Sequence, residues 1–297
     1  MDFRRRHAGR IAASAAGILA TVLLAGVPGA ARRQEPPLPD AQAFLADTIS
    51  RVRSNDLVRS RYTFTEKETR YTRDSNGRVV KTQVRVYEVH PSPEPELTYR
   101  RLVLVNGVEP KDLAKRDAEQ QRKESEWAAA RRREGEDARA ARLRRAAEED
   151  RREQAVLAEL TSIYDFRMTG RDTIDGRPAL RYTFDPRPGY RPATPEGRII
   201  NHFSGQAWID EADRELATLR VSCHDSVSVK FGFIFRLLKG SRGHIERRKI
   251  GGGSWLPTYS RFTGSGRVFF IARVDLDQES EFSSYRRIDA DVAWQAR

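Results

Sequence analysis

The sequence has a single cysteine, Cys223, among its 297 residues. One thiol cannot form a disulfide within the chain, so the fold must be stabilised by a hydrophobic core. A chain of this length can bury such a core, as one large β domain or as two smaller ones. Cysteine is also missing at position 27, where Val27 follows the Leu-Leu-Ala-Gly of residues 23–26. Because a lipoprotein lipidation box requires Cys at that position, acylation there is excluded.

The sequence also lacks a catalytic or metal-binding constellation. Its histidines are scattered without ligand spacing, and Cys223 and His224 are neighbours that point to opposite faces of a strand. Asp210 and Asp213 lack the spacing of a calcium loop, and the glycines at 251–253 do not precede a helix. We therefore expect no enzyme, with an unrecognised hydrolase as the alternative, and neither a cofactor nor a metal.

Long hydrophobic runs are missing except near the N-terminus. Residues 11–27 are apolar, follow a basic stretch that includes Arg4 and Arg10, and precede the small residues at 29–31. This pattern predicts a secretory signal peptide over residues 1–31 and a periplasmic mature protein without a stable transmembrane anchor. A retained anchor is the competing interpretation, but the run is diluted by small residues. A Pro-rich linker over residues 32–40 follows.

Acidic residues are outnumbered by basic ones, which gives a formal net charge of +12. Residues 1–31 hold four Arg and one Asp, so their removal lowers the charge to +9. In an exported protein we expect no nucleic-acid partner. The basic surface could instead meet anionic lipid head groups or acidic proteins, or it could simply be a charged soluble surface.

Most of the remaining chain alternates apolar and polar residues with the period of a β-strand. A short amphipathic helix is predicted at 41–55, and roughly nine or ten strands follow it, separated by turn sequences such as Asn76-Gly77 and Asp175-Gly176. One hairpin spans residues 203–222, with Trp208 in the core or in contact with a ligand, and with a solvated acidic turn at 210–213. The fold class predicted is α+β, mainly antiparallel β, with a sheet that curls toward a barrel.

A charged segment, residues 111–159, interrupts this pattern. It contains 14 Lys plus Arg, 13 Asp plus Glu and no proline. Pairs such as Glu148–Arg152 are spaced for i,i+4 contacts of about 0.2–0.5 kcal/mol each. We predict a long solvated helix, either continuous or folded back near Gly135, and define 109–162 as a helical insertion in a domain that spans 41–297.

Two stretches are rich in phenylalanine. In "KFGFIFRLLKG", which begins at Lys230, Phe231, Phe233 and Phe235 alternate within one predicted strand. A core strand is favoured there, and an element that touches acyl chains or a membrane is the alternative. In "RVFFIARVDL", which begins at Arg267, the same pattern predicts a second continuous strand.

The hairpin "GQAWIDEADRELATLRV", the strand "GGSWLPTYSRFTGSG" and the last strand "QESEFSSYRRI" together resemble the LolA-like superfamily of periplasmic lipoprotein-sorting proteins. The resemblance rests on Gly205-x-x-Trp208-Ile209-Asp210 and on Trp255-Leu256-Pro257, and it covers about residues 41–107 and 164–290. It implies an incomplete, half-open β-barrel around a short N-terminal helix, with an apolar concave face that can hold acyl chains. The helical insertion departs from the pattern of that superfamily.

We therefore predict a lipid- or lipoprotein-binding carrier with an apolar groove on the concave face. The candidate groove residues are Phe64, Trp208, Phe231, Phe233, Phe235, Trp255 and Phe270. The alternative is an envelope sensor or interaction protein that binds a protein partner through Lys111–Glu159, with the half-barrel as its platform. An inner face lined with charge would argue against acyl binding.

Overall fold

The structure is a computed structural model that describes residues 36–74, 76–92, 94, 97–230, 234–251, 253–268 and 272–288. At 52–59, 229–230, 234–236, 266–268 and 272–275 it describes the backbone alone. The chain divides after Pro37, and all the elements discussed here belong to the unit Leu38–Arg297. The predicted signal peptide lies outside the described residues.

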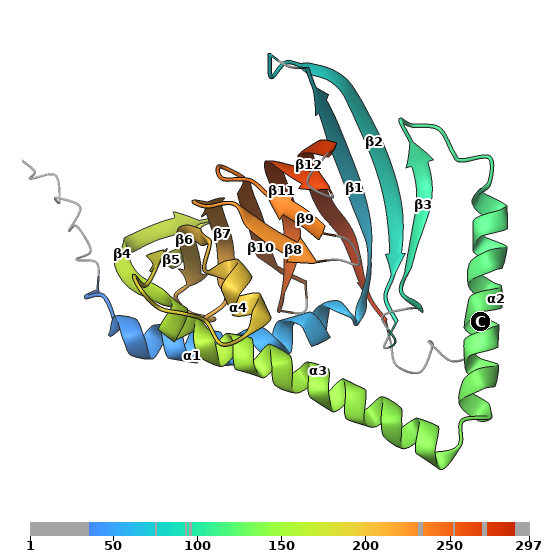
Figure 1. Cartoon of the computed structure of the whole chain (residues 1–297), viewed down its shortest axis with the longest axis horizontal. Coiled ribbons are helices and arrows are strands. Elements are labelled where there is room, and N and C mark those ends of the chain that lie inside the picture. The colour runs from blue at the N-terminus through green and yellow to red at the C-terminus, as the bar shows by residue number, and fades with distance from the viewer. Residues whose placement is uncertain are drawn as a thin grey trace, which may run out of the picture. The chain divides into compact units, whose positions relative to one another are not determined.

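The described residues form one antiparallel sheet and four helices (Figure 1). The helices are α1 (Ala41–Arg59), α2 (Leu113–Arg132), α3 (Glu136–Ile163) and α4 (Pro195–Ile200). The strands are β1 (Tyr62–Arg73), β2 (Val79–His90), β3 (Tyr99–Val105), β4 (Tyr164–Ile174), β5 (Arg177–Pro186), β6 (Phe203–Asp210), β7 (Leu216–Cys223), β8 (Val227–Lys230), β9 (Ile234–Leu237), β10 (Arg242–Ile250), β11 (Ser254–Val268) and β12 (Ala272–Arg287). None of the described helices is long and apolar enough to cross a membrane.

The sheet is open. Its strand order is β3-β2-β1-β12-β11-β10-β7-β6-β5-β4, and the pair β8–β9 joins it through β11. Among the described strands β3 and β4 do not pair with each other, so the sheet ends in two edges. This confirms the predicted class, a mainly antiparallel α+β fold with a half-open barrel.

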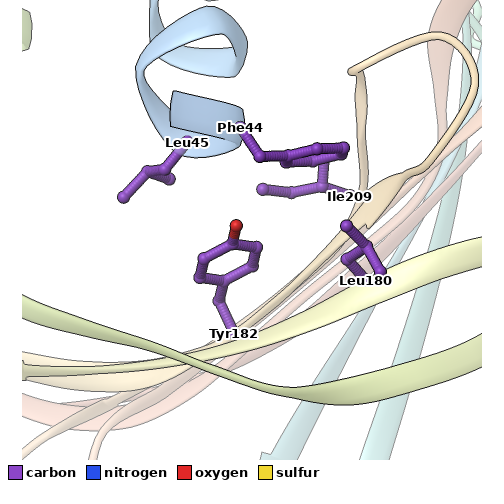
Figure 2. Close-up of a cluster of buried hydrophobic side chains, with 5 residues drawn as sticks. All are labelled: Phe44, Leu45, Leu180, Tyr182 and Ile209. Carbon is purple, nitrogen blue, oxygen red and sulfur yellow. The ribbon is translucent and has the colours of Figure 1, made fainter. Parts of the chain in front are cut away.

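Helix α1 covers one face of this sheet, which we call the inner face. Its Phe44 and Leu45 pack on Leu180, Tyr182 and Ile209 of β5 and β6 (Figure 2), and all five side chains are buried. The Tyr182 hydroxyl donates a hydrogen bond of 2.9 Å to the carbonyl oxygen of Ala41. Since each buried side chain of this size contributes about 1.5–3 kcal/mol, this cluster anchors α1 to the sheet.

The charged segment forms two helices rather than one continuous helix. The break lies at residues 133–135, beside the glycine at which the sequence analysis placed a possible fold-back. Helix α2 lies along the edge strand β3, where Asp117 accepts hydrogen bonds from the Tyr99 hydroxyl (2.7 Å) and the Arg101 guanidinium (2.9 Å). Helix α3 leads directly into β4, as Figure 1 shows, and Glu159 near its end accepts hydrogen bonds from Tyr190 and Thr194.

The two phenylalanine-rich stretches are not single strands, which corrects the sequence prediction. Lys230 pairs with Ile234 and Val227 with Leu237, so the first stretch is a hairpin of β8 and β9. Val268 pairs with Ala272, so the described residues of the second stretch are divided between β11 and β12. Gly264-Ser265-Gly266 is part of β11, and a Cβ on Gly264 would lie only 2.4 Å from the Ser241 Oγ, so this close approach requires a glycine.

Candidate functional site

A groove of about 310 Å³ lies on the inner face where β10, β11 and β12 meet. Ile245 pairs with Ser260, Ser260 pairs with Ser280, and residues directly opposite each other in an antiparallel sheet share a face. The volume is at the lower end of the range for small-molecule sites. The groove is lined by Gly243, His244, Ile245, Ser260, Arg261, Phe262, Leu276, Gln278 and Ser280.

The groove offers an apolar surface without unbalanced charge. Ile245 is 40% exposed and Leu276 is 37% exposed, although they are large apolar side chains in the middle of the sheet. The side chains of His244 and Arg261 point to the opposite face, because these residues alternate with Ile245 and Ser260 along their strands. On that face Arg261 pairs with Asp277 (3.1 Å) and Glu279. The groove can therefore accept an apolar chain without desolvating an uncompensated charge.

A charged cluster borders the groove. Ser280 donates a hydrogen bond of 3.1 Å to Glu66, and Gln278 donates one of 3.1 Å to Glu68. Arg100 bridges both carboxylates, at 2.7 Å from the Glu66 Oε2 and 3.0 Å from the Glu68 Oε2. Because Glu66 is 8% and Glu68 1% exposed, this is a buried ionic network. A second cation, the Arg70 guanidinium, lies 2.9 Å from Glu68.

This cluster corrects the expectation of an inner face that is apolar throughout. Alternate residues of a strand lie on the same face, so Glu66 and Glu68 of β1 lie on the inner face together with Phe64. The inner side of β1 is therefore aromatic at Phe64 and acidic at the two positions after it. The inner face is thus apolar near β10–β12 and ionic near β1–β3. Of these two regions, only the first offers an apolar surface.

Two of the predicted groove residues lie on different faces. Phe64 lies on the inner face and packs against Phe282 (ring centroids 6.0 Å apart) and Tyr285 (5.2 Å). Trp208 points to the opposite face from its neighbour Ile209, which packs against α1. Its indole donates a hydrogen bond of 2.7 Å to Asp172. Trp208 therefore does not share the surface with Phe64 and the groove.

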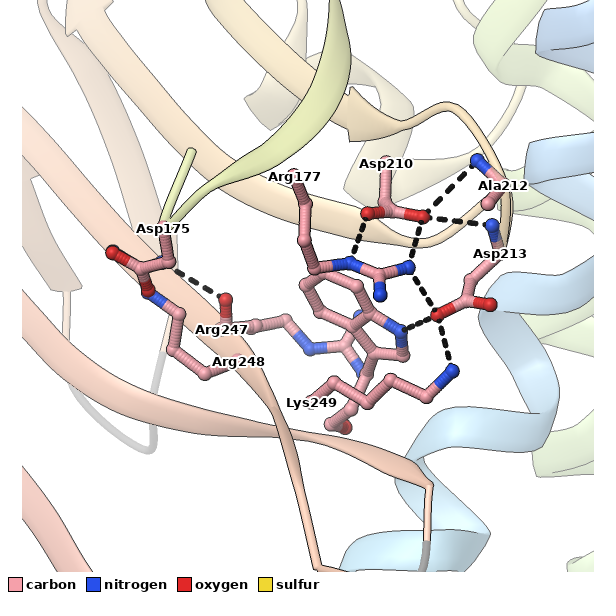
Figure 3. A network of polar contacts seen from close by, with 9 residues as sticks. Asp175, Arg177, Asp210, Ala212, Asp213, Arg247, Arg248 and Lys249 are labelled. Carbon is pink, nitrogen blue, oxygen red and sulfur yellow. Dashed lines mark hydrogen bonds and ion pairs between the residues drawn. The ribbon is translucent and has the colours of Figure 1, made fainter. Parts of the chain in front are cut away.

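Trp255 belongs to a polar network around the turn between β6 and β7 (Figure 3). Asp210, 1% exposed, accepts two hydrogen bonds from Arg177 (2.6 and 2.8 Å) and one from the backbone N–H of Asp213 (2.7 Å). Asp213 in turn accepts hydrogen bonds from Lys249 (2.8 Å), Trp255 (3.0 Å) and Arg177.

The sequence analysis expected a solvated acidic turn, but Asp210 is buried and the carboxylates of Asp210 and Asp213 are bonded within the protein. The hydrogen bond from Lys249 is the largest of the contacts that lower the pKa of Asp213. Asp210 and Asp213 connect β5, the β6–β7 turn, β10 and β11, and their hydrogen-bonding capacity is used within the protein. We assign no ligand to this cluster.

The side chains of the other predicted groove residues are not described in the structure. Phe231, Phe233 and Phe270 lie outside the described residues, and Phe235 is placed only by its backbone in β9. The sequence reasoning missed Ile245, Phe262 and Leu276. A usable signal existed for Leu276, because Val274 and Leu276 alternate with Asp275 and Asp277.

The described residues contain no group of three or more His, Cys, Asp or Glu side chains placed to hold a metal ion. Cys223 is buried, and burial raises the pKa of its thiol. A thiol in that state is a poor nucleophile at neutral pH.

No family model matches this chain, and no curated protein matches it. Three solved structures are similar over most of its length. A DUF1329 family protein from Desulfovibrio piger is 13% identical, with 87% of this chain and 98% of that chain covered and a TM-score of 0.31. MucB in complex with MucA(peri) is 12% identical over 84% and 100%, with a TM-score of 0.23. The MucA/MucB complex of Pseudomonas aeruginosa is 11% identical over 85% and 100%, with a TM-score of 0.22. Because all three TM-scores are low, we infer the function from this chain's own residues.

Proposed function

We propose that this protein is exported to the periplasm and binds an apolar chain, such as the acyl chain of a lipid or lipoprotein, in the inner-face groove. The observation that carries the proposal is the exposure of Ile245 and Leu276 in a concave site beside the small residues Gly243 and Ser260. Burying apolar surface contributes about 25 cal/mol per Å², so a chain laid over these residues gains free energy without new polar contacts.

The proposal assigns no catalytic step to the protein. The polar groups nearest the groove, Ser280 and Gln278, are hydrogen-bonded to Glu66 and Glu68. Their role is to hold the floor of the groove in place, and the ligand leaves chemically unchanged.

The test is uptake of a fluorescent fatty acid by delipidated protein. Ile245→Glu places a carboxylate in the groove, and we expect uptake to weaken by about 10-fold or more, because a charge must be desolvated by the bound chain. Val80→Glu is the matched control, since Val80 is 62% exposed on β2 and does not line the groove. Equal uptake by the two variants, or no saturable uptake by the unmodified protein, would refute acyl binding.

A second candidate function is recognition of an envelope protein through the charged helices. It is favoured by the exposure of α3 between Glu136 and Ala155, where all side chains except the half-buried Ala141 and Arg142 are exposed. A helix that buries so little is longer than the core requires. Replacing the exposed charges of this stretch with glutamine and testing capture of envelope proteins decides this candidate, which fails if every captured protein is retained.

A further inference from the structure

Three arginines from three neighbouring strands surround the buried carboxylate of Glu68. The Arg70 Nε of β1 lies 2.9 Å from the Glu68 Oε1, and the Arg100 Nη2 of β3 lies 3.0 Å from its Oε2. The Arg85 Nη1 of β2 lies 3.9 Å from the Glu68 Oε1. Arg100 also donates a hydrogen bond of 2.7 Å to Glu66. We call Arg70, Arg85 and Arg100 the arginine cluster.

The arginine cluster lies on the inner face, next to the groove. Arg70 is directly opposite Gln278 in the pairing of β1 with β12, and Gln278 lines the groove. Arg85 is directly opposite Glu68 in the pairing of β1 with β2. Directly opposed residues share a face, and neighbouring strands lie about 4.8 Å apart. A ligand that lies across the strands therefore passes from the groove to Arg70 within one strand spacing.

The cluster carries more positive charge than the carboxylates that it surrounds. Three guanidinium groups face two carboxylates, those of Glu66 and Glu68. Within the described part of the chain, the three arginines form no ion pair with any other carboxylate. Because arginine remains protonated in proteins, one positive charge is in excess on this part of the inner face.

The guanidinium groups remain accessible on the side away from the sheet. The side chains of Arg70, Arg85 and Arg100 are 51%, 31% and 42% exposed, whereas that of Glu68 is 1% exposed. A guanidinium has five N–H donors, and Arg100 uses its Nε and Nη2 groups on the two glutamates. Its Nη1 group has no hydrogen-bond partner among the described residues. The glutamates thus hold the donors in place, so an incoming anion has little side-chain freedom to restrict.

We infer that the arginine cluster binds the oxyanion head of an amphiphile whose apolar chain lies in the groove. The inference rests on the proposed function and deepens it, because it makes the ligand an anionic amphiphile, such as a fatty acid or the phosphate-bearing end of a phospholipid. The fork of N–H groups in arginine matches the oxygens of a carboxylate or a phosphate. The chain gains free energy by covering Ile245 and Leu276, and the head gains it from the cluster. A neutral amphiphile gains only the first of these two contributions.

The experiment measures displacement of the neutral probe N-phenyl-naphthylamine from delipidated protein. The competitors are dodecanoate, dodecyl phosphate and dodecanol, each below the concentration at which it forms micelles, so they share one chain and differ in the head. We expect the anions to displace the probe at concentrations about 10-fold or more below that of dodecanol, because hydrogen bonds to charged groups are the strong ones. Added salt should weaken displacement by the anions and leave displacement by dodecanol unchanged. The anion that is preferred identifies the source of the head, a fatty acid or a phospholipid.

Replacing both Arg70 and Arg85 with glutamine is the test of the cluster. Two carboxylates then face the single guanidinium of Arg100, so the local charge changes sign. The preference for the anions over dodecanol should therefore fall to about one or below. The preference is a ratio of two affinities measured on the same preparation, so a smaller folded fraction in the variant does not affect it.

The matched control replaces Arg73 and Arg101 with glutamine. Their side chains are 39% and 30% exposed, and they too pair with carboxylates, those of Asp277 and Asp117. Both lie on the face opposite the cluster, because Asp277 is the neighbour of Gln278 in β12 and Arg101 is the neighbour of Arg100 in β3. The control should keep the preference for anions. A preference that persists without Arg70 and Arg85, an equal loss in the control, or no preference in the unmodified protein would overturn the inference.

The groove and the cluster fail separately in these assays. The variant without Arg70 and Arg85 should still take up the neutral probe, whereas Ile245→Glu should weaken uptake of that probe. Equal displacement by the three competitors, with probe uptake that is lost in Ile245→Glu, removes the cluster and leaves the groove. Absence of saturable probe uptake by the unmodified protein refutes the groove and with it the cluster as a head-group site.

Discussion

Arg100 compensates two buried carboxylates, and its replacement by Met should destabilise the protein markedly. Met keeps an apolar stem near the Tyr87 ring, over which the guanidinium lies at 3.9 Å, and it removes the positive charge. Glu66 and Glu68 would then lose their shared donor while remaining buried within the sheet.

The magnitude follows from the burial of the three groups. Breaking a buried ion pair by removing one member costs about 3–5 kcal/mol. The Arg100 side chain is 42% exposed, and Arg70 remains 2.9 Å from Glu68, so water and a second cation compensate part of the loss. We expect a decrease of about 2–3 kcal/mol in the free energy of unfolding, which corresponds to a fall of about 4–12 °C in Tm.

Urea unfolding followed by far-UV circular dichroism measures this change, with two comparison variants. Arg78→Met is the control, because Arg78 is 76% exposed and its ion pair with Asp74 lies in a turn. It should change stability by no more than about 0.5 kcal/mol. The combination of Arg100→Met with Glu66→Gln and Glu68→Gln should recover at least half of the loss, since no charge is left uncompensated. A loss below about 1 kcal/mol for Arg100→Met, or no recovery in the combined variant, would show that this network is not what holds β1 and β3 together.

Two further predictions concern α2 and the hairpin β6–β7. The hydrogen bond from Arg101 lowers the pKa of Asp117, so this carboxylate stabilises the fold above its unfolded pKa of about 4 and loses that effect as the pH falls through the lowered folded value. The stability advantage of the unmodified protein over Asp117→Asn should therefore be present at pH 7 and decrease as the pH falls below the unfolded pKa of about 4, and an advantage that does not decrease in acid would contradict this assignment. Gly205→Ala should cost about 3 kcal/mol or more in urea unfolding, because its Cβ would lie 2.1 Å from the Arg220 carbonyl oxygen. Gly135→Ala, with no atom within 4 Å of the added Cβ, should cost no more than about 1 kcal/mol, the loss expected for alanine at the N-cap of α3, and equal losses at both positions would refute the steric argument.

Sequence reasoning located strands correctly where a turn motif separates them, and it failed where two strands meet within an apolar stretch. The turn motifs at Asp74–Gly77 and Asp175-Gly176 correctly marked the β1–β2 and β4–β5 hairpins, because a turn depends on residues that are adjacent in the chain. The two phenylalanine-rich stretches have apolar residues at both odd and even positions, so their pattern does not show where one strand ends and the next begins. Residues 230–237 and 267–276 were therefore assigned to single strands, whereas each stretch belongs to two strands that pair with each other.

The candidate site was the part that sequence reasoning predicted least well. Tryptophan and phenylalanine residues were chosen because they are large and apolar, but Trp208 lies on the face opposite the groove, and its indole is bonded to Asp172. The groove depends instead on where small residues such as Gly243 and Ser260 oppose one another across strands. Which residues lie opposite one another depends on the register of strand pairing, and this register cannot be read from the sequence of one strand alone.

The sequence by itself determined that this chain forms an antiparallel sheet with helices near 41–55 and within the charged segment, because alternation, turn residues and helix-forming composition act over a few neighbouring residues. Only the tertiary structure decided that Glu66 and Glu68 lie buried beside an apolar groove. The physical reason is that burial and cross-strand opposition arise between residues that are distant in the chain. Glu68 and its hydrogen-bond donor Gln278, for example, are 210 positions apart in sequence.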